Sequence, residues 1–284
     1  MGPLRRAVAG EVRKLVSQPA RPRLVVAAGR AEPGLFDPDS VAWRVHGDFT
    51  IMLVGGVSAL LLQMLHPAAL AGVWDHSDFR RDMAGRLGRT ASFLSGTTFG
   101  STEEARALIA RVRAVHGRIK GVLPHGRPYS ANDPDLLTWV HVAGTWSFLQ
   151  SYLRYGPGLR AADRDRYFAE TARIALELGA ADVPTSYAAA AAYLDAMRPR
   201  LSADERTRKV AAVVLSEPAP SLRLEPVRAL LLACAIQLLP PWAAQMHRLR
   251  QGRHGTAADA GLRGLCSLLG WALTPGSPSR FATR

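Results

Sequence analysis

Residues 101–121, STEEARALIARVRAVHGRIKG, decide the fold class of this chain. Ser101 is a typical helix N-cap, and Glu103 and Glu104 follow in the first turn, where carboxylates favour the helix dipole. Apolar positions then recur at helical spacing until Gly121, which ends the pattern. The segment therefore predicts an amphipathic helix. Its inward stripe is Ala105, Leu108, Ile109, Val112, Val115, His116 and Ile119.

The same helix signals recur further along the chain. Asp133 precedes Pro134, a capping acid before a first-turn proline, and this pair begins a predicted helix that runs to about Tyr155. β-Branched alternation is almost absent, so we expect an all-α fold. Further helices are predicted for residues 163–178, 185–199 and 225–239, with another beginning after Ser202.

One helical domain fits the 284 residues, with no internal repeat and no long linker. We place this domain at residues 41–249. Residues 1–40 and 250–284 are rich in Pro, Gly and Arg. They are predicted to be a flexible basic N-terminal arm and a flexible basic C-terminal extension.

The chain is strongly basic, with 36 Lys and Arg residues against 23 Asp and Glu residues. The arginines are scattered and form no stripe with interleaved aromatic residues, so a nucleic-acid partner is not expected. The basic surface is instead expected to contact anionic lipid or an acidic partner, and no particular protein partner is predicted.

Cysteine usage and hydropathy exclude several classes of protein. Cys234 and Cys266 form neither CxxC nor CxxCH, which argues against a disulfide framework, a zinc knuckle and covalently attached haem. Residues 1–30 lack the apolar core of a secretory signal, and the longest apolar run, residues 51–65, is shorter than the roughly 20 residues that a spanning helix needs. We expect a cytoplasmic protein, either soluble or in peripheral contact with a membrane.

Two histidines lie on predicted inward helix faces. His116 belongs to the stripe of residues 101–121, and His141 is similarly placed on the next helix, with Leu137, Gly144 and Phe148. A neutral imidazole in an apolar environment is a natural ligand for haem iron. The alternative for each is a core histidine that is hydrogen-bonded to a backbone carbonyl.

A small polar group precedes these histidines. Arg86 and Thr90 are four residues apart, on one face of a predicted helix, with Arg89 beside them. Such a group could bind a carboxylate, such as a haem propionate, or an iron-bound oxygen. The alternative is a solvated basic face. His66, before Pro67, is a candidate base, as is the pair Asp75-His76, and capped turns are the alternative for both.

Familiar catalytic patterns are missing from the sequence. There is no HExxH motif and no Glu three residues before a histidine, which excludes the di-iron carboxylate signature. There is also no GxSxG, no GxGxxG after a strand and no P-loop. From the residues alone, the chain is a helical protein with two inward histidines.

Several short motifs follow one another in a particular order along the chain. They are residues 63–73, Asp75-His76-Ser77, Arg86, Arg89-Thr90, Phe99-Gly100, Val115-His116-Gly117, residues 129–134, residues 137–141, Tyr152 and Asp165-Arg166-Tyr167. This order resembles the MpaB and rubber-oxygenase (latex clearing protein) catalytic-domain family, over roughly residues 40–200. The resemblance implies a single globin-like helical domain and a non-covalent b-type haem that uses dioxygen to cleave carbon–carbon double bonds.

The resemblance also assigns roles to individual residues. His116 matches the family's proximal haem ligand, with His141 as the fallback, and Arg86 and Thr90 match its Arg and Thr beside the haem. Arg89 stands where rubber oxygenases have a Lys that can cap the distal iron site, and Arg is a poor iron ligand.

Another departure from the rubber oxygenases concerns their proposed distal base. Their acidic residue falls near Leu70, which cannot act as a base, so cleavage of polyisoprene by the same steps is not implied. His66 or Asp75 are the candidates to substitute for it.

Two functions follow as expectations. The first is a haem-dependent oxygenase that acts with dioxygen on an apolar, olefinic or lipid-like substrate. The second is a non-enzymatic helical protein that binds haem, lipid or a partner.

Overall fold

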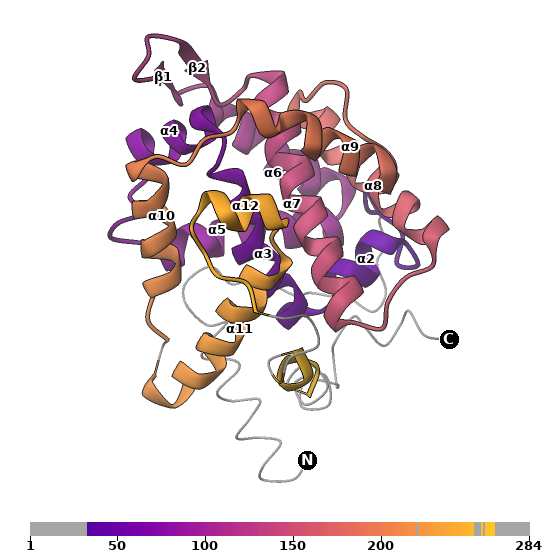
Figure 1. The fold of residues 1–284 in the computed structure, drawn as a ribbon. Coiled ribbons are helices and arrows are strands. Elements are labelled where there is room, and N and C mark those ends of the chain that lie inside the picture. The colour runs from indigo at the N-terminus through magenta and orange to yellow at the C-terminus, as the bar shows by residue number, and fades with distance from the viewer. Residues whose placement is uncertain (1–32, 220, 253–256, 258, 265–284) are drawn as a thin grey trace.

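The computed structural model describes residues 33–219, 221–252, 257 and 259–264, and the remaining parts of the two predicted arms lie outside these ranges. Helices make up most of the described chain, with one two-stranded hairpin, which confirms the all-α prediction (Figure 1). The helices are α2 (Val41–His46), α3 (Phe49–Gln63), α4 (Pro67–His76), α5 (Met83–Phe99), α6 (Thr102–His116), α7 (Pro134–Tyr155), α8 (Ala161–Leu178), α9 (Tyr187–Met197), α10 (Glu205–Ser216), α11 (Glu225–Leu238) and α12 (Pro241–Met246), with short 3-10 turns η1 (Arg198–Arg200) and η2 (Leu222–Leu224).

The predicted helix starts are observed where the capping chemistry is strongest. Ser101 caps α6 through a full capping box, in which its hydroxyl accepts from the Glu104 amide at 3.2 Å and the Glu104 carboxylate accepts from the Ser101 amide at 2.9 Å. Asp133 likewise caps α7. α6 ends at His116, earlier than the stripe suggests, because the chain then enters a hairpin of β1 (Lys120–Val122) and β2 (Pro128–Ser130).

The core is built on the contact between α3 and α7. α3 is apolar on nearly every side, which is typical of a buried helix. Gly55 lets α7 approach closely, because a Cβ at that position would lie 2.9 Å from the Phe148 ring and 3.0 Å from the Phe148 Cα. Both helices lie near the centre of the molecule, with the others arranged around them (Figure 1).

Three side-chain hydrogen bonds join α3 and α7 along their length. The Trp139 indole donates to the Gln63 carbonyl at 3.1 Å, and the Gln63 amide donates to the Val140 carbonyl at 2.8 Å. At the other end, the Ser151 hydroxyl donates to the Ile51 carbonyl at 2.8 Å. These bonds fix the relative register of the two helices.

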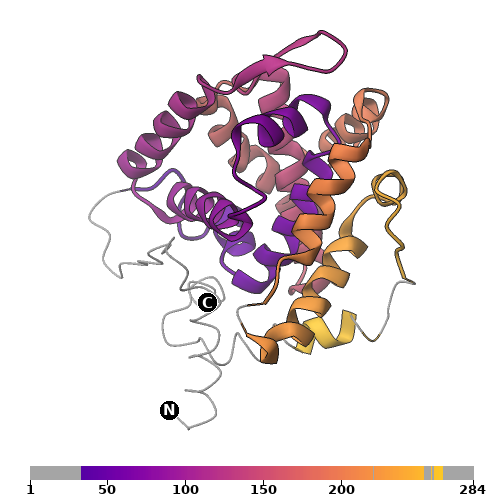
Figure 2. The ribbon, with the colours of Figure 1, turned by 90° about the vertical axis from the view of Figure 1, so that its left-hand side faces the viewer.

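α5 and α6 form an antiparallel pair at the side of this core (Figure 2). Their close approach requires Gly96, where a Cβ would overlap the Leu108 side chain. α5 also packs on α2, and α6 on α8, whereas the elements that pack most closely along α7 are α3, α8, α11, α2, α9 and α4. The pair that carries Arg86 and His116 is thus held beside α7 rather than against it.

The described parts of the predicted arms contact the helices. Phe36 is buried with Trp43 and Phe99, and Leu262 is fully buried. Arg154 of α7 pairs with Asp259 at 2.8 Å. Segments of both arms therefore contribute to the packed structure.

No single helix in the described ranges is long and apolar enough to cross a membrane. α3 and α4 meet that length and composition only when taken together, across a bend of 104°.

The α3–α7 contact gives a stability prediction with an internal control. Gly55→Ala forces Phe148 and its backbone to move, and overpacking of this kind typically costs about 1–3 kcal/mol. Gly56→Ala meets only ordinary contact at 3.8 Å, so it should be neutral or stabilise the helix by up to about 1 kcal/mol. Urea unfolding measures both changes, and equal effects of the two substitutions would contradict this account of the contact.

Candidate functional site

The polar group on α5 centres on Arg86. Its guanidinium is largely buried and donates to the Ser77 hydroxyl at 3.2 Å. Burial, and then the neighbouring Arg89, lower the pKa of Arg86. It forms no ion pair with any residue that the structure describes. A desolvated cation without a carboxylate is costly, so this position favours binding of an anion.

Arg89 and Thr90 differ from Arg86 in their surroundings. Arg89 is exposed and pairs with Asp82 at 3.3 Å. Thr90 is also exposed, and its hydroxyl donates back to the Arg86 carbonyl at 3.2 Å. Thr90 therefore lies one turn after Arg86 on α5, and its hydroxyl points back toward the Arg86 backbone carbonyl.

His116 is the last residue of α6 and is partly buried. Its Nδ1 is buried and has no hydrogen-bond partner in the described part of the chain. Burial lowers the pKa of the imidazole, which keeps it neutral near pH 7. A neutral ring with a free nitrogen is the form that coordinates a metal.

His141 meets the same condition in the middle of α7. Its Nε2 is buried without a hydrogen-bond partner among the residues described, and burial lowers its pKa to about 4. Buried side-chain nitrogens nearly always find a partner, so each unpaired one requires an explanation. His116 and His141 are two such cases.

His46 is a buried histidine that the sequence analysis missed. Its Nδ1 lies 2.8 Å from the Thr98 hydroxyl and its Nε2 lies 2.9 Å from the Tyr167 hydroxyl. Burial, and then His141, lower its pKa to about 3, which places the two imidazoles near each other. His46 is a satisfied core histidine that joins α2, α5 and α8.

The two candidate bases have structural partners. His66 is the N-cap of α4, where its Nδ1 accepts from the Ala68 amide at 3.3 Å, and burial lowers its pKa to about 4. Asp75 accepts a hydrogen bond from the Tyr129 hydroxyl at 2.8 Å. His66 thus acts as a helix cap, which is the alternative to a catalytic base that the sequence offered.

Leu70, the position of the distal acid in rubber oxygenases, is 4% exposed. It belongs to an apolar cluster that includes Val73 and Val210.

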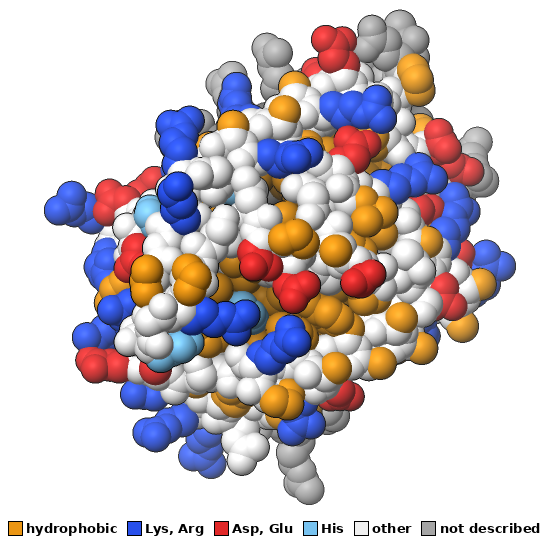
Figure 3. All heavy atoms as spheres, turned by 90° about the horizontal axis from the view of Figure 1, so that it is seen from above, with side chains coloured by type: hydrophobic (Ala, Val, Ile, Leu, Met, Phe, Trp, Pro, Cys, Tyr) orange, Lys and Arg blue, Asp and Glu red, His pale blue; other side chains and the backbone are white. Residues whose placement is uncertain are grey.

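The structure groups some of the predicted site residues. Arg86, Arg89 and Thr90 lie together on α5, and His141 lies near His46 in the core. In the ranges described, no hydrogen bond or ion pair joins Arg86 to either His116 or His141. The upper face of the molecule, seen in Figure 3, has hydrophobic side chains gathered in a hollow, with a histidine in it and arginines and acidic residues around it.

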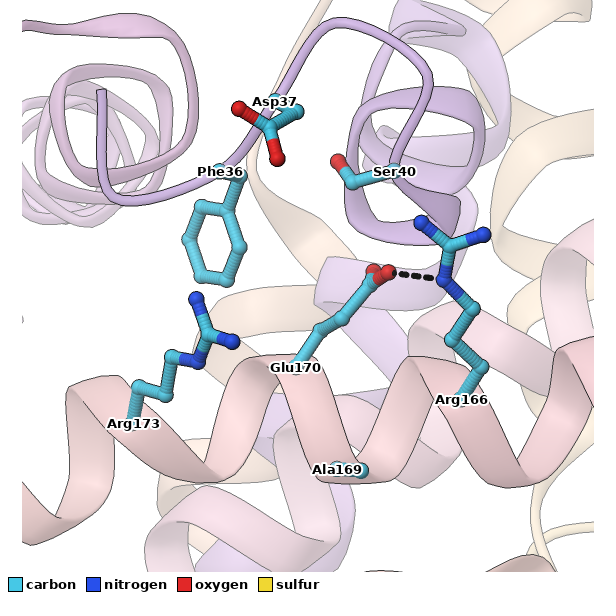
Figure 4. A pocket seen from close by; sticks show the side chains of 7 residues that line it. All are labelled: Phe36, Asp37, Ser40, Arg166, Ala169, Glu170 and Arg173. Carbon is cyan, nitrogen blue, oxygen red and sulfur yellow. Dashed lines mark hydrogen bonds and ion pairs between the residues drawn. The ribbon is translucent and has the colours of Figure 1, made fainter. Parts of the chain in front are cut away.

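A separate pocket of about 270 Å³ lies between residues 36–40 and α8 (Figure 4). Its polar groups bind one another: Arg166 contacts Glu170 at 2.7 Å, and Glu170 accepts from the Ala42 amide at 2.8 Å. Arg173 donates to the Leu35 carbonyl at 3.2 Å. The pocket contains no predicted site residue, and its hydrogen bonds fasten the entry to α2 onto α8.

No group of three or more His, Cys, Asp or Glu residues in the described ranges is arranged to hold a metal ion. Haem iron takes only one or two ligands from the protein, so this finding leaves the predicted haem site untested.

The fold and these residues define a class: a helical protein with neutral, buried histidines and a desolvated arginine. A family model described as "ER-bound oxygenase mpaB/B'/Rubber oxygenase, catalytic domain" matches residues 43–271. The chain belongs to this family, whose description is that of an oxygenase catalytic domain, as the sequence motifs predicted. No curated protein and no solved structure matched the chain, so the globin-like arrangement stays a prediction.

The buried histidines predict a pH-dependent stability. The pKa values of His46 and His141 are lowered to about 3 and about 4, below the 6.5 of the unfolded chain, so the unfolded state binds more protons at acidic pH. Stability is fully present above pH 6.5 and is lost as pH falls toward 4. Each histidine contributes a slope of up to about 1.4 kcal/mol per pH unit.

Urea unfolding of protein without added haem, at several pH values, measures this slope. His46→Gln, which cannot titrate but can still hydrogen-bond, should give a shallower slope, whereas the exposed hairpin residue His125, changed to Gln, should not. A slope that is the same in His46→Gln and the original protein would contradict the assignment.

Proposed function

We propose that this protein is a haem-b-dependent oxygenase that acts with dioxygen on an apolar, olefinic or lipid-like substrate. The observation that supports the proposal is a pair of neutral histidines, His116 and His141, whose Nδ1 and Nε2 respectively are buried without a partner in the described chain, in a member of the oxygenase family. The Nδ1 of His247 is also unpaired, but its Nε2 hydrogen-bonds to the Leu61 carbonyl at 2.8 Å. When bound, haem supplies an iron that activates dioxygen.

His116 is the proposed haem ligand, because it matches the proximal histidine that the sequence resemblance implies and because its imidazole is neutral. His141 is the alternative, since its Nε2 is also free and lies in a drier environment. Both residues would fit haem ligation chemically, and one of them would be enough to hold the iron.

Arg86 would hold a haem propionate or donate a hydrogen bond to the oxygen substrate. Its guanidinium is already desolvated and, in the described chain, is held only by the Ser77 hydroxyl, so an incoming carboxylate would compensate the buried charge. Thr90 adds a hydroxyl on the same side. The apolar hollow of the upper face would accept an apolar substrate (Figure 3).

A second function, a non-enzymatic protein that binds haem, lipid or a partner, is favoured by one observation. Leu70, which stands near the distal acid of the rubber oxygenases, is buried among apolar residues and cannot move a proton. Aerobic turnover of the haem-loaded protein with olefins and unsaturated lipids separates this function from the first.

The ligand assignment is tested by reconstitution with haem. The protein should show a Soret band, which His116→Ala abolishes or shifts strongly and His125→Ala leaves unchanged, because His125 is exposed at the turn of the hairpin. Loss of the band in His141→Ala alone would make His141 the ligand. Equal haem spectra and occupancy in all four proteins would refute haem ligation by either residue.

The role of Arg86 is tested separately. Hydrogen bonds to charged groups contribute about 1.5–3 kcal/mol, so Arg86→Ala should weaken haem binding about tenfold or more. Arg89→Ala should change it much less, because Arg89 is exposed and paired with Asp82. Haem titration followed by absorbance measures the change, with Thr90→Ala as a third variant. Full haem retention and full turnover in Arg86→Ala and Thr90→Ala would show that the pair is a surface feature.

A further inference from the structure

The β1–β2 hairpin projects from the top of the molecule, beyond the helices (Figures 1 and 2). Its loop is well defined: the Gly126 amide donates to the Leu123 carbonyl at 2.8 Å, and the Leu123 amide donates to the Arg127 carbonyl at 2.8 Å. Pro124 follows the first turn residue, and Gly126 adopts φ 86°, as expected for a three-residue hairpin loop that ends in a left-handed glycine. These hydrogen bonds and the backbone geometry of Gly126 give the projecting hairpin a defined conformation.

The inner face of the hairpin is fastened to α4. Tyr129 is buried against Ala71 and Leu123, and its hydroxyl donates to Asp75 at 2.8 Å. Gly121, opposite Tyr129 in the pair of strands, makes room for the ring, because a Cβ there would lie 2.9 Å from it. The hairpin thus has a defined inner face and a defined outer face.

The outer face carries an exposed apolar pair, and exposed cations lie on it and next to it. Val122 is 63% exposed and pairs across the strands with exposed Pro128. Residues 117–132 contain no Asp or Glu. Lys120 lies on this face beside Val122 by strand alternation, with exposed Arg118 in the turn before β1 and exposed Arg127 in the hairpin loop.

Arg118, Lys120 and Arg127 form no ion pair with any of the residues that the structure describes. Some exposed cations elsewhere do: Arg106 pairs with Glu177, and Lys209 with Glu205. Unpaired cations beside an exposed apolar pair are complementary to an anionic surface that also accepts apolar side chains.

We propose that the β1–β2 hairpin docks on an anionic phospholipid membrane, with Val122 and Pro128 in the headgroup region and Arg118, Lys120 and Arg127 on the lipid phosphates. A nucleic acid fits less well, because the only Phe, Tyr or Trp side chain of the hairpin, Tyr129, is buried and unable to stack on bases. A protein partner fits less well, because a stable interface needs about 800 Å² on each side, more than a narrow tip presents.

The placement has a consequence for the proposed function. β1 begins four residues after His116, and the hairpin belongs to the same upper face as the apolar hollow (Figures 1 and 3). Docking would turn this hollow toward the membrane, where apolar substrates dissolve. This consequence rests on the proposed function, whereas the docking itself requires neither haem nor activity.

The experiment is cosedimentation of the full chain, without haem, with vesicles of phosphatidylcholine that do or do not contain phosphatidylserine. The protein should bind only the phosphatidylserine vesicles, and added salt should weaken the binding. Each basic residue near an anionic membrane contributes about a fivefold change in partitioning, so Lys120→Gln with Arg127→Gln should lower it about 25-fold. Val122→Gln should lower it further.

The matched control lies at the other end of the molecule, in the connection between α10 and α11. Leu222 is 89% exposed and is followed by Arg223, so it is another apolar tip beside a cation, but Glu217 and Glu225 flank it. Leu222→Gln with Arg223→Gln should leave vesicle binding unchanged. Circular dichroism and thermal unfolding show whether all variants keep the fold.

Several results would overturn the proposal. These are no binding of the original protein to phosphatidylserine vesicles, equal binding by the hairpin variant, or an equal loss in the control variant. Binding of duplex DNA that depends on Lys120 and Arg127, at a salt concentration where vesicles are not bound, would assign the hairpin to nucleic acid instead. None of these outcomes depends on whether haem binds.

Discussion

The close contact between α3 and α7 is the constraint on which the rest of the structure depends. Gly55 allows the two backbones to meet, and the carbonyls of both helices accept hydrogen bonds from the side chains of Gln63 and Trp139. α3 is apolar almost all round, so it must be enclosed, and α7, α11 and α2 enclose it. With the centre filled in this way, the α5–α6 pair can only pack at the side, against α2 and α8.

This arrangement explains why the candidate site combines apolar surroundings with polar groups. His141 faces outward from the central pair toward His46, whose two ring nitrogens already have hydroxyl partners. His46 is therefore part of the framework, while His141 and His116 each retain a buried nitrogen with no partner in the described chain. In the described chain, hydrogen bonds hold both ring nitrogens of His46 and one of His247, whereas none holds a ring nitrogen of His116 or His141, and this difference separates core histidines from candidate ligands here.

Local signals predicted much of the fold, and tertiary contacts decided the rest. Ser101 and Asp133 were predictable as caps because a cap and its amide partners lie within three residues of each other. The hairpin was not predicted, since its strands have three residues each and are held by contacts with α4. His46 was missed because its partners, Thr98 and Tyr167, lie 52 and 121 residues away in the sequence. The sequence placed Arg86 in the site but could not show that it lacks a carboxylate, because that depends on distant residues.

The two positions that depart from the rubber oxygenases limit which part of their chemistry this chain can share. Arg89 is exposed and pairs with Asp82, and a guanidinium is a poor ligand for iron. Leu70 is enclosed by α10 side chains such as Val210 and Val214, so a base at this position would be buried without a partner. Neither change touches Arg86, His116 or His141. The residues proposed to hold a haem are therefore independent of these two positions, and a base for the proposed reaction would have to come from another residue or from the substrate.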